Sequence, residues 1–494
     1  MSFAKTYTRG LLGLHAPLIE VEVHVSQGLP SLTIVGLAEA AVRESKDRVR
    51  SAIINSGYAF PMKRLTINLA PADLPKDGAR LDLAIALGIL IASDQVPAPS
   101  NHIEFIGELA LDGQLRATTG TLSIAIACQQ ASHALILPKD NANEAAQLQQ
   151  LTVFAAESLK QVCQHLSQHT PLTPYQREVS VSAQHYALDL ADVKGQLRPR
   201  RALEIAAAGG HSILFRGPPG TGKTLLASRL PSILPPLTLE ESLEVAQIYS
   251  VANNPHVFGQ RPFRAPHHTA SGVALVGGGS HPKPGEITLA HLGVLFLDEL
   301  PEFDRKVLEV LRQPLESKEI VISRATRQIT FPANFQLIAA MNPCPCGYAF
   351  NQDQRCQCSP ESIKRYQSRI SGPLLDRIDL HIDVPALAAH ELQSTQPSDS
   401  SETVRQRVMQ AYEQQMQRQG FLNQALSSQQ LEYYAKLNAD CSKIITMAQE
   451  KLQLSARAYH RILRVARSIA DLAQSPNIEV SHLTESLSYR NPQT

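Results

Sequence analysis

Short apolar runs alternate with helix-period segments along the first third of the chain. The runs with strand-like spacing are Ile19–Val25, Leu32–Val35, Leu65–Leu69 and Phe105–Leu111. An amphipathic pattern with helical spacing covers Glu39–Ser56, between the second and third of these runs. Strands and helices that alternate in this way indicate an α/β or α+β domain, which we place at residues 1–170.

A second group of apolar runs has the spacing of a parallel sheet. Ser212–Arg216, Gly293–Leu297 and Phe335–Ala340 are continuous apolar strands separated by long connections. This predicts an α/β core at 188–385, after a polar, proline-containing linker at 171–187. A second polar linker at 386–401 precedes helical patterns, notably Leu454–Ala473, which predict an all-α lid at 402–494.

Composition and charge exclude several classes of protein. A chain of 494 residues exceeds what one core usually holds, and its 46 basic and 45 acidic residues give a net charge near +1. That balance provides no general attraction to nucleic acid or to an anionic membrane, so any basic surface must be local. The most apolar run, Leu81–Ala92, is shorter than the roughly 20 residues that span a bilayer, and the first residues lack a secretory signal. We therefore expect a cytoplasmic protein.

The segment GPPGTGKT carries the clearest chemistry. It follows an apolar strand and precedes a helix-period run, the context that a phosphate-binding P-loop requires. Its glycines allow backbone amides to surround phosphate, Lys223 reaches the β- and γ-phosphates, and the Thr224 hydroxyl is a ligand for Mg²⁺. The alternative is a chance glycine-rich turn. The predicted nucleotide-binding residues are Gly217, Pro218, Pro219, Gly220, Thr221, Gly222, Lys223 and Thr224.

Polar residues at the ends of two further strands complete the predicted site. Asp298 and Glu299 end the strand GVLFLDE, where Asp298 would orient the metal ion and Glu299 would activate the attacking water. The paired acids favour ATP over GTP, because signalling GTPases usually position water with glutamine. Asn342 ends the next strand and is expected to position the water beside the γ-phosphate. A solvated acid pair and a turn-forming Asn-Pro are the alternatives.

Several long blocks carry a family resemblance. They are DVKGQLRPRRALEIAAAGGHSILFRGPPGTGKT, RPFRAPHHTAS, PGEITLAHLGVLFLDEL, AAMNPCPCG and LLDRIDLHID. Together they resemble the magnesium-chelatase-like AAA+ ATPases of the YifB/ComM family over nearly the whole chain. The resemblance implies a hexameric, ring-forming DNA translocase or helicase that promotes branch migration in homologous recombination and natural transformation.

The same resemblance implies arginines that complete the site. Arg377, in LLDRIDL, matches the position of the arginine finger that a neighbouring subunit supplies. Arg369 is its near rival, and a structural salt bridge is the alternative for either. Arg457 matches the sensor-two helix of the lid, with a solvated cationic helix face as its alternative.

The first domain resembles the proteolytic domain of Lon-type proteases. Arg80 stands where those proteases carry the nucleophilic serine, and Leu122 stands where they carry the activating lysine. Without both groups serine-lysine chemistry has no residues to use, so we expect a non-proteolytic platform.

Four cysteines are close together in one short segment. Cys344, Cys346, Cys356 and Cys358 can close a tetrahedral structural zinc site, although the spacing is tighter than in usual zinc pairs and free thiols are the alternative. The family resemblance supports zinc. The neighbouring pair His267 and His268 has no cysteine or carboxylate at ligand spacing, so we assign it no metal.

The segment ESKEIVISRATRQITFP predicts two short strands joined by a basic turn. In related ring motors a hairpin here lines the pore, so Lys318, Arg324 and Arg327 are candidates for contacts with the DNA backbone that are independent of sequence. A plain solvated hairpin is the alternative. The rival functions are a chelatase-like ATP-dependent protein remodeller without DNA activity, a Lon-like protease, and a nucleotide-gated scaffold.

Overall fold

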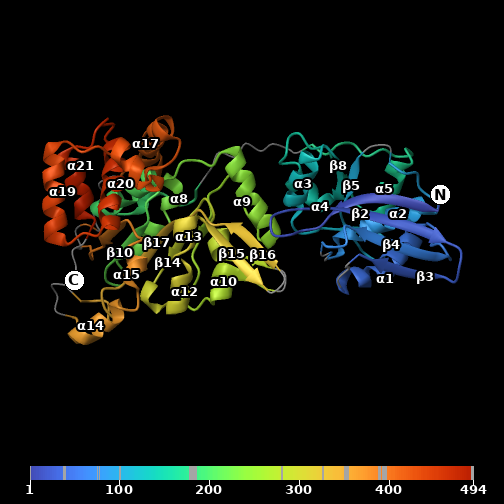
Figure 1. Ribbon diagram of the computed structural model, residues 1–494, viewed down its shortest axis with the longest axis horizontal. Coiled ribbons are helices and arrows are strands. Elements are labelled where there is room, and N and C mark those ends of the chain that lie inside the picture. The colour runs from blue at the N-terminus through green and yellow to red at the C-terminus, as the bar shows by residue number, and fades with distance from the viewer. Residues whose placement is uncertain are drawn as a thin grey trace. The chain divides into compact units, whose positions relative to one another are not determined.

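The computed structural model has two compact units (Figure 1). It describes residues 2–36, 40–74, 76, 78–99, 102–176, 186–279, 282–324, 327–349, 355–387, 391 and 398–490. The first unit comprises Met1–Val181 with Leu243–Phe258, and the second comprises Ser182–Ser242 with Gly259–Thr494. In the described part of the chain, no helix has the length and apolar character needed to cross a bilayer.

The first unit is built on a seven-stranded mixed sheet with the order β3-β4-β2-β1-β5-β8-β9. Its strands are β1 (Phe3–Arg9), β2 (Leu18–Ser26), β3 (Ser31–Val35), β4 (Arg64–Ala70), β5 (Ile103–Phe105), β8 (Ala134–Pro138) and β9 (Val153–Ala156). β1 pairs antiparallel with β2, and β2 antiparallel with β4, whereas the other neighbours are parallel. Alternate side chains of β2 are buried, because successive residues of a strand point to opposite faces.

In the described residues, helices from the first 170 positions accompany this sheet. They are α1 (Ala40–Asn55), α2 (Asp82–Ala92), α3 (Thr121–Gln130), α4 (Lys139–Ala145) and α5 (Leu159–Leu166). Every residue of α2 is buried, which explains why its sequence is apolar on all sides, and the helix packs on β1, β2 and α1. The prediction of one strand over Phe105–Leu111 was wrong. The chain breaks at Gly107, where a Cβ would lie 2.8 Å from Leu115, and a separate hairpin forms from β6 (Glu108–Leu109) and β7 (Leu115–Arg116).

One helix of the first unit comes from a distant part of the chain. Most of α9 (Leu239–Ala252) belongs to this unit although the P-loop precedes it in sequence. The Gln247 side chain donates to the Leu14 carbonyl at 2.8 Å, and the Ser250 carbonyl accepts from the Gly120 amide at 3.1 Å. The sequence interpretation assigned this segment to the second domain.

The second unit contains a five-stranded, fully parallel sheet with the order β11-β14-β17-β10-β18. The strands are β10 (Ile213–Arg216), β11 (Phe263–Arg264), β14 (Val294–Leu297), β17 (Gln336–Met341) and β18 (Leu380–Asp383). All four residues of β14 are buried, as expected for a strand covered on both faces. Because the strands are parallel, the segments that follow β10, β14 and β17 meet at one edge of the sheet.

Short helices and hairpins surround this sheet. The helices are α6 (Leu197–Gly209), α7 (Lys223–Ala227), α8 (Leu230–Ile233), α10 (Gly272–Val276), α11 (Glu286–Leu289), α12 (Arg305–Val310), α13 (Pro314–Ser317), α14 (Pro360–Gln367) and α15 (Gly372–Leu375). One hairpin pairs β12 (Gly277–Gly278) and β13 (Lys283–Pro284). The other pairs β15 (Glu319–Arg324) and β16 (Arg327–Pro332). The predicted basic hairpin is confirmed as the antiparallel pair β15 and β16.

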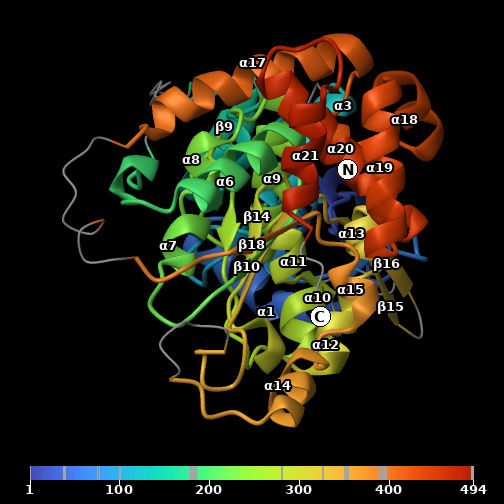
Figure 2. The same ribbon diagram turned by 90° about the vertical axis from the view of Figure 1, so that its left-hand side faces the viewer.

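The C-terminal part is helical, as the pattern predicts (Figure 2). Its helices are α17 (Ser401–Gln419), α18 (Ser428–Tyr434), α19 (Ala439–Leu452), α20 (Ala456–Leu472) and α21 (Val480–Ser488). Side chains of Ser400, Ser427, Asn438 and Ser455 cap the first four of these helices. Val408 of α17 and Ile469 of α20 share one apolar core with Phe215 of the sheet, so the lid packs against the P-loop module.

Candidate nucleotide site

The loop between β10 and α7 requires glycine at two kinds of position. A Cβ at Gly217 would lie 2.2 Å from the Val384 carbonyl oxygen, so no side chain fits there. Gly220 and Gly222 have φ values of 76° and 88°, in the left-handed region that glycine adopts without strain. The sequence GPPGTGKT therefore folds into a tight loop that leads into α7 at Lys223.

Lys223 is held at the centre of this loop. Its ammonium donates to the carbonyl oxygens of Gly217 and Pro218, each at 2.8 Å, and to Asn342 Oδ1 at 3.2 Å. Burial lowers the pKa of Lys223, and the nearby carboxylates of Asp298 and Glu299 oppose that shift. The loop thus contains a positively charged donor beside the ends of β14 and β17.

Thr224 and Asp298 bring two hard oxygen ligands together. The Thr224 hydroxyl donates to Asp298 Oδ2 at 2.7 Å, and Asp298 Oδ1 accepts from the Glu299 amide at 2.9 Å. A hydroxyl and a carboxylate are the ligands that Mg²⁺ takes beside nucleotide phosphates. The residues present therefore fit a Mg²⁺ ion between them.

Glu299 stands on strained backbone and has an unforeseen partner. Its φ is 52°, uncommon for a residue with a side chain, and the side chain is 52% exposed. His268 Nδ1 lies 3.1 Å from Glu299 Oε2, and its ring contacts those of His267 and Phe303. Sequence reasoning missed this contact because it depends on β11 pairing with β14, which brings the segment after β11 to the end of β14.

The predicted arginines lie apart from the loop of their own chain. Arg377 Nη2 is 2.6 Å from Glu316 Oε1, and Arg457 Nη2 is 3.6 Å from the same oxygen. Arg369 pairs instead with Glu302 at 2.8 Å. In the described residues, the hydrogen bonds and ion pairs of these three arginines all involve groups outside 217–224.

The basic hairpin differs from the expectation at Lys318. This residue precedes β15 with a φ of 62°, and its ammonium donates to Asn334 Oδ1 at 2.8 Å and Gln424 Oε1 at 3.2 Å. Burial lowers its pKa. The side chain therefore points to two amide groups rather than along the hairpin, and its contact with DNA stays a prediction. Arg324 and Arg327 pair through their backbones at the end of the hairpin, and their side chains lie outside the described residues.

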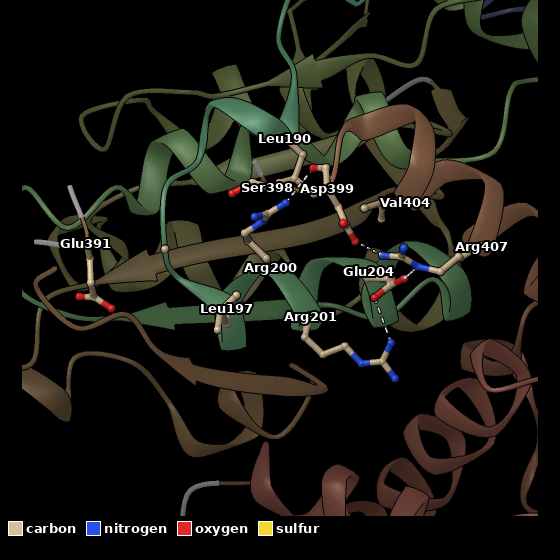
Figure 3. Close-up of a pocket in the computed structure, with 11 residues that line it drawn as sticks. Leu190, Leu197, Arg200, Arg201, Glu204, Glu391, Ser398, Asp399, Val404 and Arg407 are labelled. Atoms are coloured by element: carbon tan, nitrogen blue, oxygen red, sulfur yellow. Dashed lines mark hydrogen bonds and ion pairs between the residues drawn. The ribbon is translucent and has the colours of Figure 1, made fainter. Parts of the chain in front are cut away.

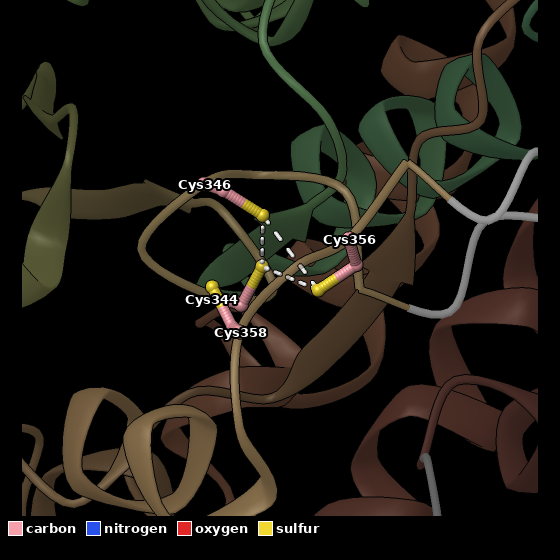
Figure 4. A group of neighbouring side chains, drawn as sticks. All are labelled: Cys344, Cys346, Cys356 and Cys358. Carbon is pink, nitrogen blue, oxygen red and sulfur yellow. Dashed lines mark hydrogen bonds between the residues drawn. The ribbon is translucent and has the colours of Figure 1, made fainter.

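The four predicted cysteines come together in space (Figure 4). The sulfur atoms of Cys344, Cys346, Cys356 and Cys358 all lie within 4.8 Å of one another. The Ala349 amide donates to Cys344 Sγ at 3.2 Å, and a hydrogen bond from the Tyr348 backbone lowers the pKa of Cys346 to about 6. Four sulfur ligands at this spacing fit a tetrahedral Zn²⁺ ion with no position left open for catalysis.

A cavity of about 430 Å³ lies beside the segment that leads into α6 (Figure 3). Arg407 pairs with Glu204 at 2.5 Å and with Asp399 at 2.8 Å, while Arg201 also pairs with Glu204 at 2.9 Å. Arg200 donates to the Asp399 carbonyl at 2.8 Å. The guanidinium groups that line this cavity thus pair with carboxylates or with a carbonyl oxygen of the same cavity.

In the first unit, the two positions compared with proteases are both buried. Leu122 lies in an apolar cluster with Ile124 and Cys128, and Arg80 lies in the short helical turn before α2. Neither side chain is a nucleophile or an amine base.

A P-loop after the interior parallel strand β10, an acid pair after β14, which is separated from β10 by β17 in the same sheet, and a helical lid define a nucleotide-binding module of the AAA+ type. Family models described as magnesium chelatase subunit ChlI match residues 189–392 and 21–141, and one for the ChlI C-terminal region matches residues 398–490. The chain belongs to the magnesium-chelatase-like YifB/ComM family.

Full-length relatives support this membership. The chain is 51% identical to "Competence protein ComM" of Haemophilus influenzae, over 99% of this chain and 98% of that protein. It is 50% identical to "Uncharacterized protein YifB" of Escherichia coli, over 99% and 97% respectively. "Magnesium-chelatase 67 kDa subunit" of Heliobacterium mobile is 26% identical over 40% of this chain and 31% of its own length.

Proposed function

We propose that this protein is an ATP-hydrolysing, hexameric ring motor that moves along DNA and promotes branch migration in homologous recombination and natural transformation. The observation that carries the ATPase part is the meeting of Lys223, the Thr224–Asp298 pair and Glu299 at one edge of the parallel sheet. The name of the ComM relative, a competence protein, supports a role with incoming DNA.

Each residue has a role in phosphoryl transfer to water. The loop amides and Lys223 hold the β- and γ-phosphates, and Asn342, which accepts from Lys223, orients the water or the γ-phosphate. Glu299 takes the proton of the attacking water. Mg²⁺, held by Thr224 and Asp298, would neutralise phosphate charge.

A neighbouring subunit would complete the site with Arg377, because this arginine makes its contacts away from the loop of its own chain. We assign Arg457 to the same face, since both arginines reach Glu316. Arg369, held by Glu302 and the Pro301 carbonyl, also makes its contacts away from the loop, so the choice of Arg377 rests on the match of LLDRIDL to the family's finger position.

The remaining assignments concern zinc and DNA. The four cysteines would hold a structural Zn²⁺ that fixes the loop after β17. DNA contacts would come from Arg324 and Arg327 at the end of the β15–β16 hairpin, through phosphates rather than base edges.

The second candidate function is a chelatase-like protein remodeller without DNA activity. The net charge near +1 and the inward direction of Lys318 favour it, because both reduce the positive surface available to DNA. The partial match to a magnesium-chelatase subunit is consistent with such a role.

Steady-state ATPase assays with and without four-way-junction DNA test the proposal. We expect junction DNA to stimulate turnover, Glu299→Gln to abolish it, and junction migration on gels to depend on ATP. Glu432→Gln, an exposed acid of α18 outside the site, is the matched control and should behave as wild type. Hydrolysis that is indifferent to every DNA tested would favour the remodeller instead.

A further inference from the structure

A second cavity of the second unit, about 440 Å³ in volume, has an excess of positive charge. Its acids are Glu316 and Asp379, and its cationic lining consists of Lys318, Arg377, Arg457, Arg461 and Arg464. This composition contrasts with the cavity of Figure 3, where carboxylates pair with the arginines.

One of the two acids is already committed to the protein interior. Asp379 Oδ2 accepts from both the amide and the hydroxyl of Ser212 at 3.1 Å, and lies 3.6 Å from His211. Burial opposes its ionisation, but the nearby His211 ring and the charge of Arg461 hold its pKa well below the usual range. Asp379 is therefore ionised and balances part of the positive charge, chiefly that of Arg461, whose Nε lies 3.5 Å from Asp379 Oδ1.

The cations of the cavity are only partly satisfied. Burial lowers the pKa of Arg461 to about 10 and also lowers the pKa values of Lys318 and Arg464. Among the described residues, the buried Nη1 of Arg461 and the buried Nε of Arg377 have no hydrogen-bond acceptor. The Arg377 side chain is only 8% exposed. Buried charged donors without acceptors are unfavourable, so the cavity is suited to an anion.

Glu316 supplies the counter-charge on the open side of the cavity. Its Oε1 lies 2.6 Å from Arg377 and 3.6 Å from Arg457, and its side chain is 54% exposed. One half-exposed carboxylate thus engages both arginines that the proposed function assigns to a neighbouring subunit. Ion pairs that are exposed to this extent contribute little free energy, so a competing anion can replace the carboxylate.

We propose that Glu316 is a built-in counter-ion of this cavity, and that it is displaced by the terminal phosphates of the nucleotide on a neighbouring copy, which the proposed function already brings to Arg377 and Arg457. Glu316 acts as a positioning residue: it keeps Arg377 and Arg457 neutralised in the free subunit and releases them when a nucleotide-loaded neighbour docks. This inference rests on the proposed ATPase function but not on any activity with DNA.

The first test measures ATPase activity without DNA as a function of protein concentration. Glu316→Gln keeps the shape but removes the charge, so we expect the concentration for half-maximal activity to fall about threefold to fivefold, in the range set by half-exposed ion pairs. Glu316→Asp should remain close to wild type. Glu309→Gln, which breaks a separate surface pair with Arg312, is the matched control and should leave that concentration unchanged. An unchanged or raised concentration for Glu316→Gln would overturn the proposal.

The second test needs no hydrolysis and separates the possible sources of phosphate. Inorganic tripolyphosphate is titrated by calorimetry into Lys223→Ala protein, whose P-loop is disabled. Weak binding that Glu316→Gln strengthens and Arg461→Ala removes supports the anion site. If Glu316→Gln strengthens this binding but leaves the ATPase concentration dependence unchanged, the cavity serves a free polyphosphate and the role for a second copy is overturned. No binding to either Glu316 form overturns the anion site itself.

Discussion

Replacing Gly217 with alanine tests whether the loop after β10 is the phosphate cradle. The added Cβ would lie 2.2 Å from the Val384 carbonyl oxygen, closer than such atoms approach in folded proteins. Val384 cannot easily yield, because its amide donates to the Arg216 carbonyl at 2.8 Å where β18 ends beside β10. The loop itself must therefore move, by about 1 Å to restore an ordinary contact.

That displacement sets the expected magnitudes. Overpacking of this kind costs about 1–3 kcal/mol, and each kcal/mol lowers the melting temperature by about 2–4 °C in a unit of this size. A misplacement of about 1 Å in a catalytic constellation lowers the rate by about 10²-fold. Gly217→Ala should therefore lose most of its ATPase activity while the protein stays folded.

The assay compares kcat, nucleotide affinity and thermal unfolding in two variants. Gly372→Ala is the control, since a Cβ there meets no atom within 4 Å. It should retain wild-type activity. If Gly217→Ala kept its ATPase rate within about threefold of wild type, the position of this loop would not govern hydrolysis.

Three further predictions follow from particular contacts. His268→Ala should lower kcat by about tenfold with little change in nucleotide Kd, because it frees Glu299 without touching the loop. Chelation of zinc, or Cys346→Ser, should lower the melting temperature, and elemental analysis should find one Zn²⁺ per chain. Asp379→Asn should destabilise the protein by about 3–5 kcal/mol at pH 7, since it leaves buried His211 and Arg461 without their carboxylate.

The stability difference between wild type and Asp379→Asn should depend on pH in a specific way. The folded pKa of Asp379 is depressed below its ordinary 3.8, so its stabilisation is present above that value and is lost as pH falls through the folded pKa. Denaturant titrations should therefore show a constant gap between wild type and Asp379→Asn above pH 5 that narrows only in strong acid. A gap that closes near neutrality would contradict this assignment. A kcat in His268→Ala equal to that of wild type would contradict the prediction for His268. An unchanged melting temperature after zinc removal would contradict the prediction for the cysteine cluster.

Much of the second unit could be predicted because its signals are local. GPPGTGKT specifies its own loop through glycine geometry, and the buried strand before Asp298 is apolar throughout because both faces are covered. The cysteine cluster is equally local, since its four thiols come from one short segment. The break at Gly107 was missed, because an apolar run does not reveal where a side chain would collide with Leu115.

The sequence alone determined the chemistry of the site: a P-loop, an acid pair, four neighbouring cysteines and a basic hairpin. Only the tertiary structure decided which distant groups meet. His268 reaches Glu299 because β11 pairs with β14, and Arg377 and Arg457 share Glu316 because the lid packs on the sheet module. Lys318 points to Asn334 and Gln424 for the same reason. Local patterns set backbone conformation, whereas contacts between distant residues depend on strand order and packing, which no short pattern encodes.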